Sequence, residues 1–310
     1  MTSELRIVSL LPSATEIVAG LGLTDALVGR SHECDYPPEI KNLPVCTEAR
    51  LNSDRQSAVI DRDVQQLLQQ ALSIYKVKID VLEQLQPTHI ITQDQCDVCA
   101  VNFAEVTKAV ARLTSSQPEI ISLQPNLLKD VWQDIAKVGQ SLGVEYRSVI
   151  QQLHERINSI TQEVKTVGRD SLPTVVAVEW IEPLMTGGNW IPELIEIAGG
   201  KPLLSDKGKH SPYISLSNLI AANPDVIVIM PCGFDLERTA EEVKVMTNYP
   251  QWSELKAVQN NRVYIVDGNA YFNRSGNRLV DSAEILAEIF HPHLFNFGFK
   301  ETWRSLIFIE

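Results

Sequence analysis

Two cysteines three positions apart, Cys96 and Cys99, stand in a chain that has only five cysteines. The pair comes directly after the apolar segment 88–92, which is typical of a buried strand. Two cysteines at this spacing can bind zinc, cuprous copper or iron-sulfur clusters as thiolates, or they can form a redox pair. They can also pack as small buried side chains. The neighbouring carboxylates of Asp94 and Asp97 would raise the pKa of the first thiol, which argues against a redox nucleophile.

Two further cysteines also follow predicted strands. Cys34 comes after the strand at 26–31 and Cys232 after the strand at 225–229. Because the carboxyl ends of parallel strands meet at one edge of a sheet, four of the five cysteines are expected at edges that bind ligands. A metal site made from Cys34, Cys96, Cys99 and Cys232 is therefore one hypothesis. Packing of the strand-to-helix turns is the alternative, and it is favoured for Cys232 and for the loop residue Cys46.

An alternation of strands and helices positions these side chains. A capping box of Ser13 and Glu16 predicts that the first helix begins at Ser13. Hydrophobic patterning predicts strands in the first part of the chain at 6–11, 26–31, 88–92 and 119–123. Strands separated by helices in this way indicate a parallel sheet that is covered by helices.

The alternation is interrupted over residues 127–166 and resumes after Pro173. The interruption contains a helix from Glu145 to about Val164, with apolar residues three to four positions apart. The segment LQPTHIITQDQC before it is echoed by ANPDVIVIMPCG after it. We therefore predict an α/β fold with two lobes, mainly parallel sheets flanked by helices, and one long backbone helix between them. The predicted parts are an N-terminal lobe at 1–125, connecting helices at 126–168 and a C-terminal lobe at 169–310.

Composition excludes several classes of function. The net charge is −12 and no run of Lys or Arg is present, which argues against nucleic acid and anionic membrane surfaces as partners. No stretch of about 18 apolar residues predicts a membrane-spanning helix. Pro12 and Glu16 interrupt the apolar N-terminal segment, so it does not read as an export signal. We accordingly expect a monomeric cytoplasmic protein, or a periplasmic one if translation starts upstream.

The order of several segments resembles the helical-backbone substrate-binding proteins of ABC transporters, in the branch that binds cobalamin (vitamin B12) or iron complexes. The segments are RIVSLLPSATEIVAGLGL, CDYPPEI, LQPTHII, MTGGNWIPELIEIAGGKPLL, SLSNLIAANPDVIVIMPCGFDLERT and NRVYIVDGNAYFNRSGNRLVDSAEIL. The resemblance implies a non-catalytic protein that holds its ligand in a cleft between two lobes and docks on a transporter permease. It implies a corrinoid ligand and no required cofactor, with siderophores and haem as further candidates.

The resemblance also assigns roles to individual positions. A corrinoid has a broad apolar rim and polar amides, so aromatic side chains supply contact area and a few polar groups fix orientation. Trp180 and Trp190 bracket the TGGN loop and are candidates for stacking on the ligand. The remaining predicted ligand-binding residues are Ser13, Thr15, Tyr36, Tyr75, Gln93, Tyr213, Phe272 and Arg274.

Two carboxylates match positions that dock on the permease in this class. They are Asp80 and Glu196, and Asp80 departs from the usual glutamate. The alternative for both is an ordinary solvated carboxylate on a helix. A second hypothesis for the whole chain is a cytoplasmic metal- or thiol-dependent protein that uses Cys96 and Cys99 on the same scaffold.

Overall fold

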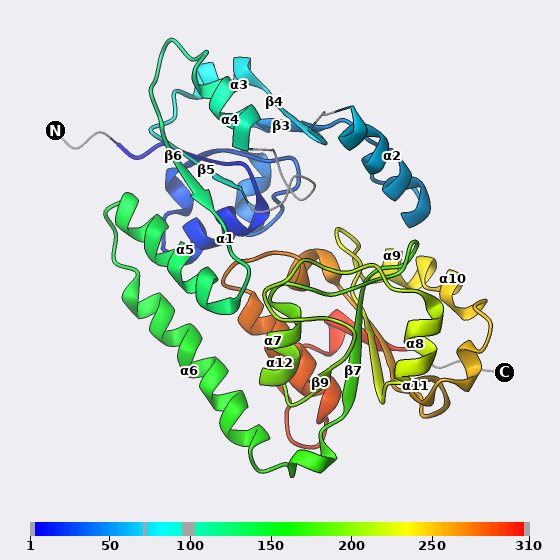
Figure 1. The fold of residues 1–310 in the computed structure, drawn as a ribbon. Helices are drawn as coiled ribbons and strands as arrows, with labels where there is room; N and C mark the ends of the chain where they lie inside the picture. Colours follow the sequence, from blue (N-terminus) through cyan, green and yellow to red (C-terminus); the bar gives the residue numbers. More distant parts are fainter. Residues whose placement is uncertain (1–3, 71–72, 95–102, 307–310) are drawn as a thin grey trace. The chain divides into compact units, whose positions relative to one another are not determined.

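The structure is a computed structural model that describes residues 4–70, 73–94 and 103–306 (Figure 1). The chain forms two compact units, each of which is described by itself. The N-terminal lobe comprises Met1–Arg55, Val59–Pro125 and Lys129–Gln151. The C-terminal lobe comprises Gln56–Ala58, Asn126–Leu128 and Gln152–Glu310.

A parallel four-stranded sheet forms the core of the N-terminal lobe. Its strand order is β2-β1-β5-β6, and every neighbouring pair is parallel. The central strands are built from buried apolar residues, with Ile7, Val8, Ile90 and Ile91 all inaccessible to solvent. The strands are β1 (Ile7–Ser9), β2 (Leu27–Arg30), β5 (His89–Gln93) and β6 (Glu119–Leu123).

Helices and a small antiparallel pair complete this lobe. The pair consists of β3 (Thr47–Ala49) and β4 (Tyr75–Val77). Buried side chains of β4 and of two helices, α3 and α4, pack with β1 and β5 in one apolar cluster. The helices are α1 (Pro12–Gly20), α2 (Ser57–Gln69), α3 (Ile79–Leu85), α4 (Phe103–Val110) and α5 (Leu128–Ser141), with 3-10 turns at Thr24–Ala26 and Pro38–Asn42.

The first helix begins one residue earlier than the predicted capping box. It starts at Pro12 with Leu11 as N-cap, and no side chain caps it. Proline suits the first helical position because its missing N–H would have no partner there in any case. Ser13 and Glu16 therefore both lie inside the helix as buried residues, and the prediction that Ser13 caps it is wrong.

The C-terminal lobe contains a six-stranded mixed sheet. Its order is β12-β11-β10-β7-β8, with β9 pairing alongside β7. The pairs β7–β10, β10–β11 and β7–β9 are parallel, whereas β8 and β12 run antiparallel to their neighbours. The strands are β7 (Thr174–Trp180), β8 (Met185–Thr186), β9 (Lys201–Pro202), β10 (Val226–Ile229), β11 (Val263–Val266) and β12 (Trp303–Ser305).

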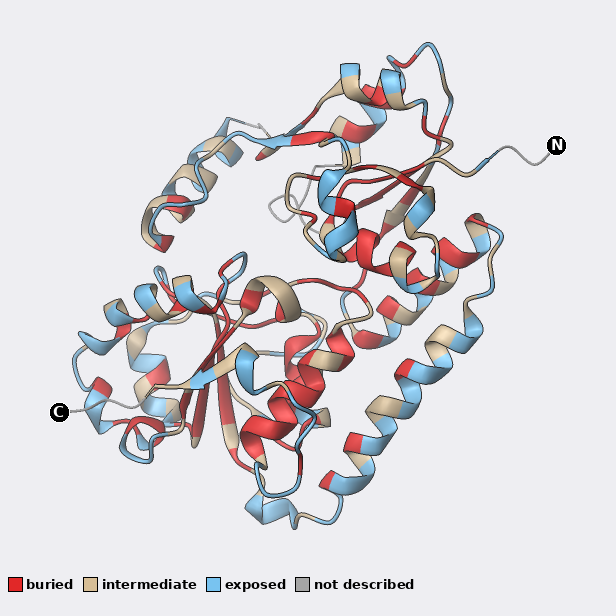
Figure 2. Ribbon diagram, turned by 180° about the vertical axis from the view of Figure 1, so that it is seen from behind, coloured by how far each residue is buried: buried red, intermediate tan, exposed pale blue. Residues whose placement is uncertain are grey.

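Helix α12 (Leu279–Phe290) is the most deeply buried helix of this lobe, as Figure 2 shows. It contacts α7 (Ile191–Ile197), and 11 of its 12 residues are buried, which fits a helix inside a large core. The other helices are α8 (Leu216–Ala222), α9 (Leu236–Glu242), α10 (Lys244–Thr247) and α11 (Lys256–Gln259). A π-helical turn covers Gly268–Phe272, and 3-10 turns cover Arg169–Ser171, Trp252–Glu254 and Lys300–Thr302.

The long helix α6 (Arg147–Val164) begins among the residues of the first lobe and ends among those of the second. Its 18 residues correspond to a length of about 27 Å. The predicted α/β class, with two lobes, largely parallel sheets and a long helix, is confirmed. In the part of the chain that the structure describes, no helix has the length and apolarity needed to cross a membrane.

Candidate functional site

The carboxyl end of β1 carries a buried hydroxyl and thiol network. The Thr15 hydroxyl lies 2.8 Å from Ser9 Oγ and 3.0 Å from Cys34 Sγ. Ser9 donates its own hydroxyl hydrogen to the Leu11 carbonyl at 3.0 Å. All of these side chains are buried, so the network ties the start of α1 to the loop after β2.

Two predicted ligand-binding residues, Ser13 and Thr15, lie within this buried layer, with 3% and 0% of their surface exposed. A third, Gln93, ends β5 and is 4% exposed. All three follow or end strands at the same edge of the sheet, as the sequence predicts. Their role as ligand contacts stays a prediction.

His32, two residues past the end of β2, is held by Thr47. Its Nδ1 lies 2.7 Å from Thr47 Oγ1, and its backbone N–H donates to the same oxygen at 3.0 Å. Thr47 in turn donates its hydroxyl hydrogen to Ser31 Oγ at 3.0 Å. Burial lowers the pKa of His32, and the positive charges of Lys78 and Arg30 lower it further. Apart from its place next to the cysteine loop, nothing in the local sequence singles out this histidine.

Tyrosines surround this histidine loop. The ring of Tyr75 lies 5.3 Å from that of His32, at an interplanar angle of 50°. Its hydroxyl donates to Glu33 Oε1 at 2.7 Å. Tyr36 follows in the same loop and is 44% exposed. The predicted pair of Tyr36 and Tyr75 thus comes from two segments that flank His32.

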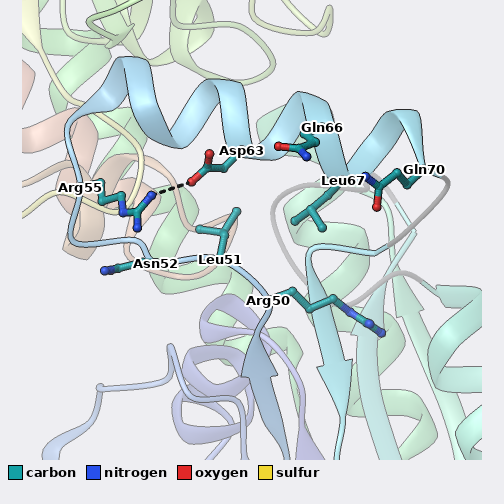
Figure 3. Close-up of a pocket in the computed structure, with 8 residues that line it drawn as sticks. All are labelled: Arg50, Leu51, Asn52, Arg55, Asp63, Gln66, Leu67 and Gln70. Atoms are coloured by element: carbon teal, nitrogen blue, oxygen red, sulfur yellow. Dashed lines mark hydrogen bonds and ion pairs between the residues drawn. The ribbon is translucent and has the colours of Figure 1, made fainter.

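A cavity of about 330 Å³ opens in the same lobe, between α2 and the segment after β3 (Figure 3). Its wall is mainly polar, and Arg55 reaches across it to Asp63 at 3.4 Å. The lining residues are Arg50, Leu51, Asn52, Arg55, Asp63, Gln66, Leu67 and Gln70. None of the residues predicted to bind ligand lines this cavity.

The cysteines of the metal hypothesis have different surroundings. Cys34 is buried beside Thr15, and Cys232 is exposed. Cys96 and Cys99 lie outside the described residues. Within the described ranges, no group of three or more His, Cys, Asp or Glu side chains is placed to hold a metal ion. Burial raises the pKa of the Cys46 thiol to about 12, which agrees with a packing role for this residue.

In the C-terminal lobe, Trp180 ends β7 at the carboxyl edge of the sheet. Its ring lies edge-on to that of Phe234, with 5.4 Å between the ring centroids. The guanidinium of Arg238 covers the Phe234 ring at 3.5 Å from its centroid. Trp180 also donates its indole N–H to the Glu182 carbonyl at 3.1 Å. The predicted stacking candidate Trp180 is therefore half-buried and packs against the buried ring of Phe234, which Arg238 covers.

Trp190 has a different environment. It is 7% exposed and donates its indole N–H to the Phe272 carbonyl at 2.9 Å, while Phe272 itself is fully buried. The preceding Gly188 packs against another loop so closely that a Cβ would lie 2.4 Å from the backbone nitrogen of Ser211. The predicted contacts at Trp190 and Phe272 therefore correspond to buried side chains in the structure.

The remaining predicted residues lie in segments that border this edge. Tyr213 is 54% exposed, and its backbone bridges to Met185, whose partner in the ladder is Trp180. Arg274 is 5% exposed and donates to Asn269 Oδ1 at 3.1 Å. Asn273 donates to the Met230 carbonyl at 3.1 Å, which ties the segment of Arg274 to the end of β10.

The two predicted docking carboxylates are both exposed on helices. Asp80 lies in the first turn of α3, and Glu196 lies on α7. Lys207 donates to Glu196 Oε2 at 2.6 Å. Docking on a permease requires exposed carboxylates, but most surface carboxylates are exposed whether or not they dock on another protein.

Comparison with known proteins identifies relatives along almost the whole chain. The model of the family described as periplasmic binding protein matches residues 7–270. The substrate-binding lipoprotein YvrC of an ABC transporter of Bacillus subtilis is 25% identical over 297 residues, which cover 94% of this chain and 81% of the relative. A vitamin B12-binding protein of Vibrio campbellii is 25% identical over 296 residues, with coverage of 92% and 89%.

A solved structure shows the same fold. The crystal structure of a periplasmic heme binding protein from Pseudomonas aeruginosa matches with a TM-score of 0.73 and 18% identity, over 97% of each chain. The resemblance to substrate-binding proteins of ABC transporters is thus confirmed.

These findings correct the predicted location. A cytoplasmic protein was expected, but the matching family is periplasmic and one relative is a lipoprotein, which points to a location outside the cytoplasm. The prediction of a cytoplasmic protein is therefore wrong. The hypothesis of a cytoplasmic thiol- or metal-dependent protein receives no support from the comparisons.

Proposed function

Because this chain belongs to the periplasmic binding protein family, we propose that it binds a cobalamin-like corrinoid and delivers it to an ABC transporter permease. Proteins of this kind capture a small molecule and are components of transport without catalysis. The relative named as a vitamin B12-binding protein supports the choice of ligand, since it aligns with 92% of this chain. Fold alone would not decide the ligand, because one fold serves many ligands.

The exposure of Tyr36 and Tyr213 is the observation that carries the proposal. Each is about half exposed in the free protein, and each lies in a segment next to the carboxyl ends of a parallel sheet. Ligands of open α/β sheets bind at such edges. At each edge, a flat amphipathic ring offers contact area of the kind that a corrin ring requires.

Titration monitored by visible absorbance tests the ligand. Cyanocobalamin, aquocobinamide and haemin are added separately to the purified protein. We expect both corrinoids to bind with a dissociation constant of about 1 μM or lower, and haemin to bind more weakly. Tight binding of haemin with no binding of either corrinoid would contradict the proposal.

Substitutions of the two tyrosines test the site. Loss of an aromatic contact typically weakens binding by about 1–2 kcal/mol, so Tyr36→Ala and Tyr213→Ala should each weaken corrinoid binding about tenfold. Leu294→Ala is the matched control, because Leu294 is also an exposed apolar side chain but lies beyond α12. Equal affinities for all three variants and the wild type would exclude these tyrosines from the site.

Delivery to the permease is proposed to use Asp80 and Glu196. Their exposure on α3 and α7 supports this role. With the cognate transporter in vesicles, the Asp80→Asn/Glu196→Gln double variant should stimulate ATP hydrolysis less than the wild type and bind ligand equally well. Asp206→Asn, which changes another exposed carboxylate of the C-terminal lobe, is the control. Unchanged stimulation by the double variant would argue against docking through these residues.

A further inference from the structure

The imidazole of His32 has one nitrogen engaged and one available. Nδ1 lies 2.7 Å from Thr47 Oγ1, and within the described ranges Nε2 has no hydrogen-bond partner. The ring is partly buried and packs at 5.3 Å from the ring of Tyr75. The side chain is therefore held in place by a hydrogen bond and an aromatic contact, and neither of them uses Nε2.

The hydrogen bonds around Thr47 determine which nitrogen carries the hydrogen. The single hydroxyl hydrogen of Thr47 goes to Ser31 Oγ, so its oxygen can only accept from His32. Nδ1 must then be the protonated nitrogen, and the lone pair of the neutral ring lies on Nε2. A histidine that ligates a metal usually has this arrangement, with its other N–H donated to a fixed oxygen.

The position of His32 favours a metal in a ligand over other uses of a neutral imidazole. The residue follows β2 at the carboxyl edge of the parallel sheet, beside the predicted contacts Tyr36 and Tyr75. In the described ranges, no cluster of three or more His, Cys, Asp or Glu side chains could hold a metal ion by itself. A single imidazole at this edge suits a metal whose other coordination sites are already filled by its own macrocycle.

We propose that Nε2 of His32 coordinates the metal ion of a metallotetrapyrrole ligand at an axial position. This inference rests on the proposed function, and it adds a preference for complexes with an exchangeable axial site. The bond forms when Nε2 displaces a labile axial ligand such as water, with no change in oxidation state. Thr47 and Ser31 act as positioning residues that keep the hydrogen on Nδ1.

Electron paramagnetic resonance of bound cob(II)inamide tests the bond directly. This corrinoid lacks the nucleotide base, so an axial nitrogen can come only from the protein. An axial nitrogen splits each cobalt hyperfine line into a triplet, whereas an oxygen ligand leaves it unsplit. We expect triplets with the wild type, doublets with protein labelled with the heavier nitrogen isotope in histidine, and unsplit lines with His32→Ala.

His210→Ala is the matched control. His210 is also a histidine in a loop, and its Nδ1 lies 3.1 Å from the Ser211 carbonyl, but its side chain is exposed. Triplets retained by His210→Ala support the assignment to His32. Triplets lost in His210→Ala and retained in His32→Ala would overturn it.

A binding comparison provides a second readout. Dicyanocobinamide has both axial positions blocked, so the wild type should bind aquocobinamide about tenfold more tightly, and His32→Ala should lose this preference. Thr47→Val keeps the imidazole but removes the acceptor for Nδ1, so it should reduce the preference. An unchanged preference in Thr47→Val would overturn the positioning role, and it can be measured even if His32→Ala does not fold.

The outcomes separate the two proposals. Corrinoid binding without nitrogen splitting would overturn the role of His32 and leave the proposed function standing. Failure to bind any corrinoid, with haemin bound in a complex whose absorbance and paramagnetic resonance spectra change in His32→Ala but not in His210→Ala, would support His32 and overturn the corrinoid assignment. Failure to bind either class of tetrapyrrole would overturn both.

Discussion

Asp134 on α5 should make the stability of the protein depend on pH. The residue is 7% exposed, and its Oδ2 has no hydrogen-bond partner among the residues that the structure describes. Burial raises the pKa of this carboxyl to about 7, against the opposing effects of Lys137 and a hydrogen bond from the Gln124 backbone. In the unfolded chain the carboxyl titrates near 3.8.

The sign of the effect follows from proton uptake. Between the unfolded and the folded pKa, folding binds a proton at Asp134, so the free energy of unfolding decreases as pH rises from about 4 to about 7. Above that window the full cost of burying the charged carboxylate is present. The difference between the two pKa values corresponds to at most about 4 kcal/mol, and we expect about 2 kcal/mol because the carboxyl keeps some contact with solvent.

Asp134→Asn isolates this contribution because it keeps the shape of the side chain and removes its titration. Urea unfolding of both proteins, followed by circular dichroism from pH 4 to pH 8, should show the variant gaining about 2 kcal/mol relative to the wild type across that range. A carbon NMR titration of the Asp134 carboxyl provides an independent value of its pKa. Parallel stability profiles for the two proteins would refute the reasoning.

Three further predictions concern other buried groups. Arg156→Ala should lower the free energy of unfolding by about 3 kcal/mol, because it leaves the buried Glu284 carboxylate without its cation. In the wild type, Arg156 Nε donates to this carboxylate at 2.9 Å. Thermal melting of an Arg156→Met/Glu284→Met double variant should show that part of the loss is recovered. Glu288→Ala should cost about 2–3 kcal/mol and speed hydrogen exchange at 297–299, whose backbone N–H groups donate to Glu288 Oε1; equal exchange would contradict it. At pH 8, iodoacetamide should modify the buried Cys46 roughly a hundredfold more slowly than the exposed Cys232, as measured by mass spectrometry. In urea, where the chain is unfolded, the two cysteines should react at similar rates.

The sheets could be predicted because their strands are continuous buried apolar runs. The predicted strand at 88–92 corresponds to β5, and the one at 225–229 corresponds to β10, to within one residue. Helices between such strands favour parallel pairing, which is the observed arrangement at the centre of both lobes. Periodicity and burial are properties of neighbouring residues, and for that reason a single sequence displays them.

The start of α1 shows the limit of local patterns. Ser13 and Glu16 have the spacing of a capping box, but Pro12 occupies the first helical position and shifts both residues inside the helix. The position of Ser13 and Thr15 just after β1 could be predicted for the same reason that β1 itself could be predicted. Their burial depends on the packing of Ser9 and Cys34 around them, which involves residues far apart in the sequence.

His32 could not have been selected from its sequence neighbourhood, because its partner is Thr47. The two meet because the chain returns beside β2, where Arg30 pairs with Val45 and the Cys46 N–H donates to the Arg30 carbonyl at 2.8 Å. The separation of 15 residues between His32 and Thr47 fits no short motif. Tertiary contacts of this kind decide hydrogen-bond geometry, and a pattern within a single segment does not contain them.

Aromatic area and a directed lone pair should respond differently to substitution. At Tyr36 and Tyr213 the ligand contact consists of ring surface, so replacement by another aromatic residue should preserve most of the affinity. At His32 the contact consists of one nitrogen whose protonation is determined by Thr47 and Ser31, and no other side chain reproduces that combination. The tyrosines should therefore set how tightly a tetrapyrrole binds, whereas His32 should set which axial state of its metal is accepted.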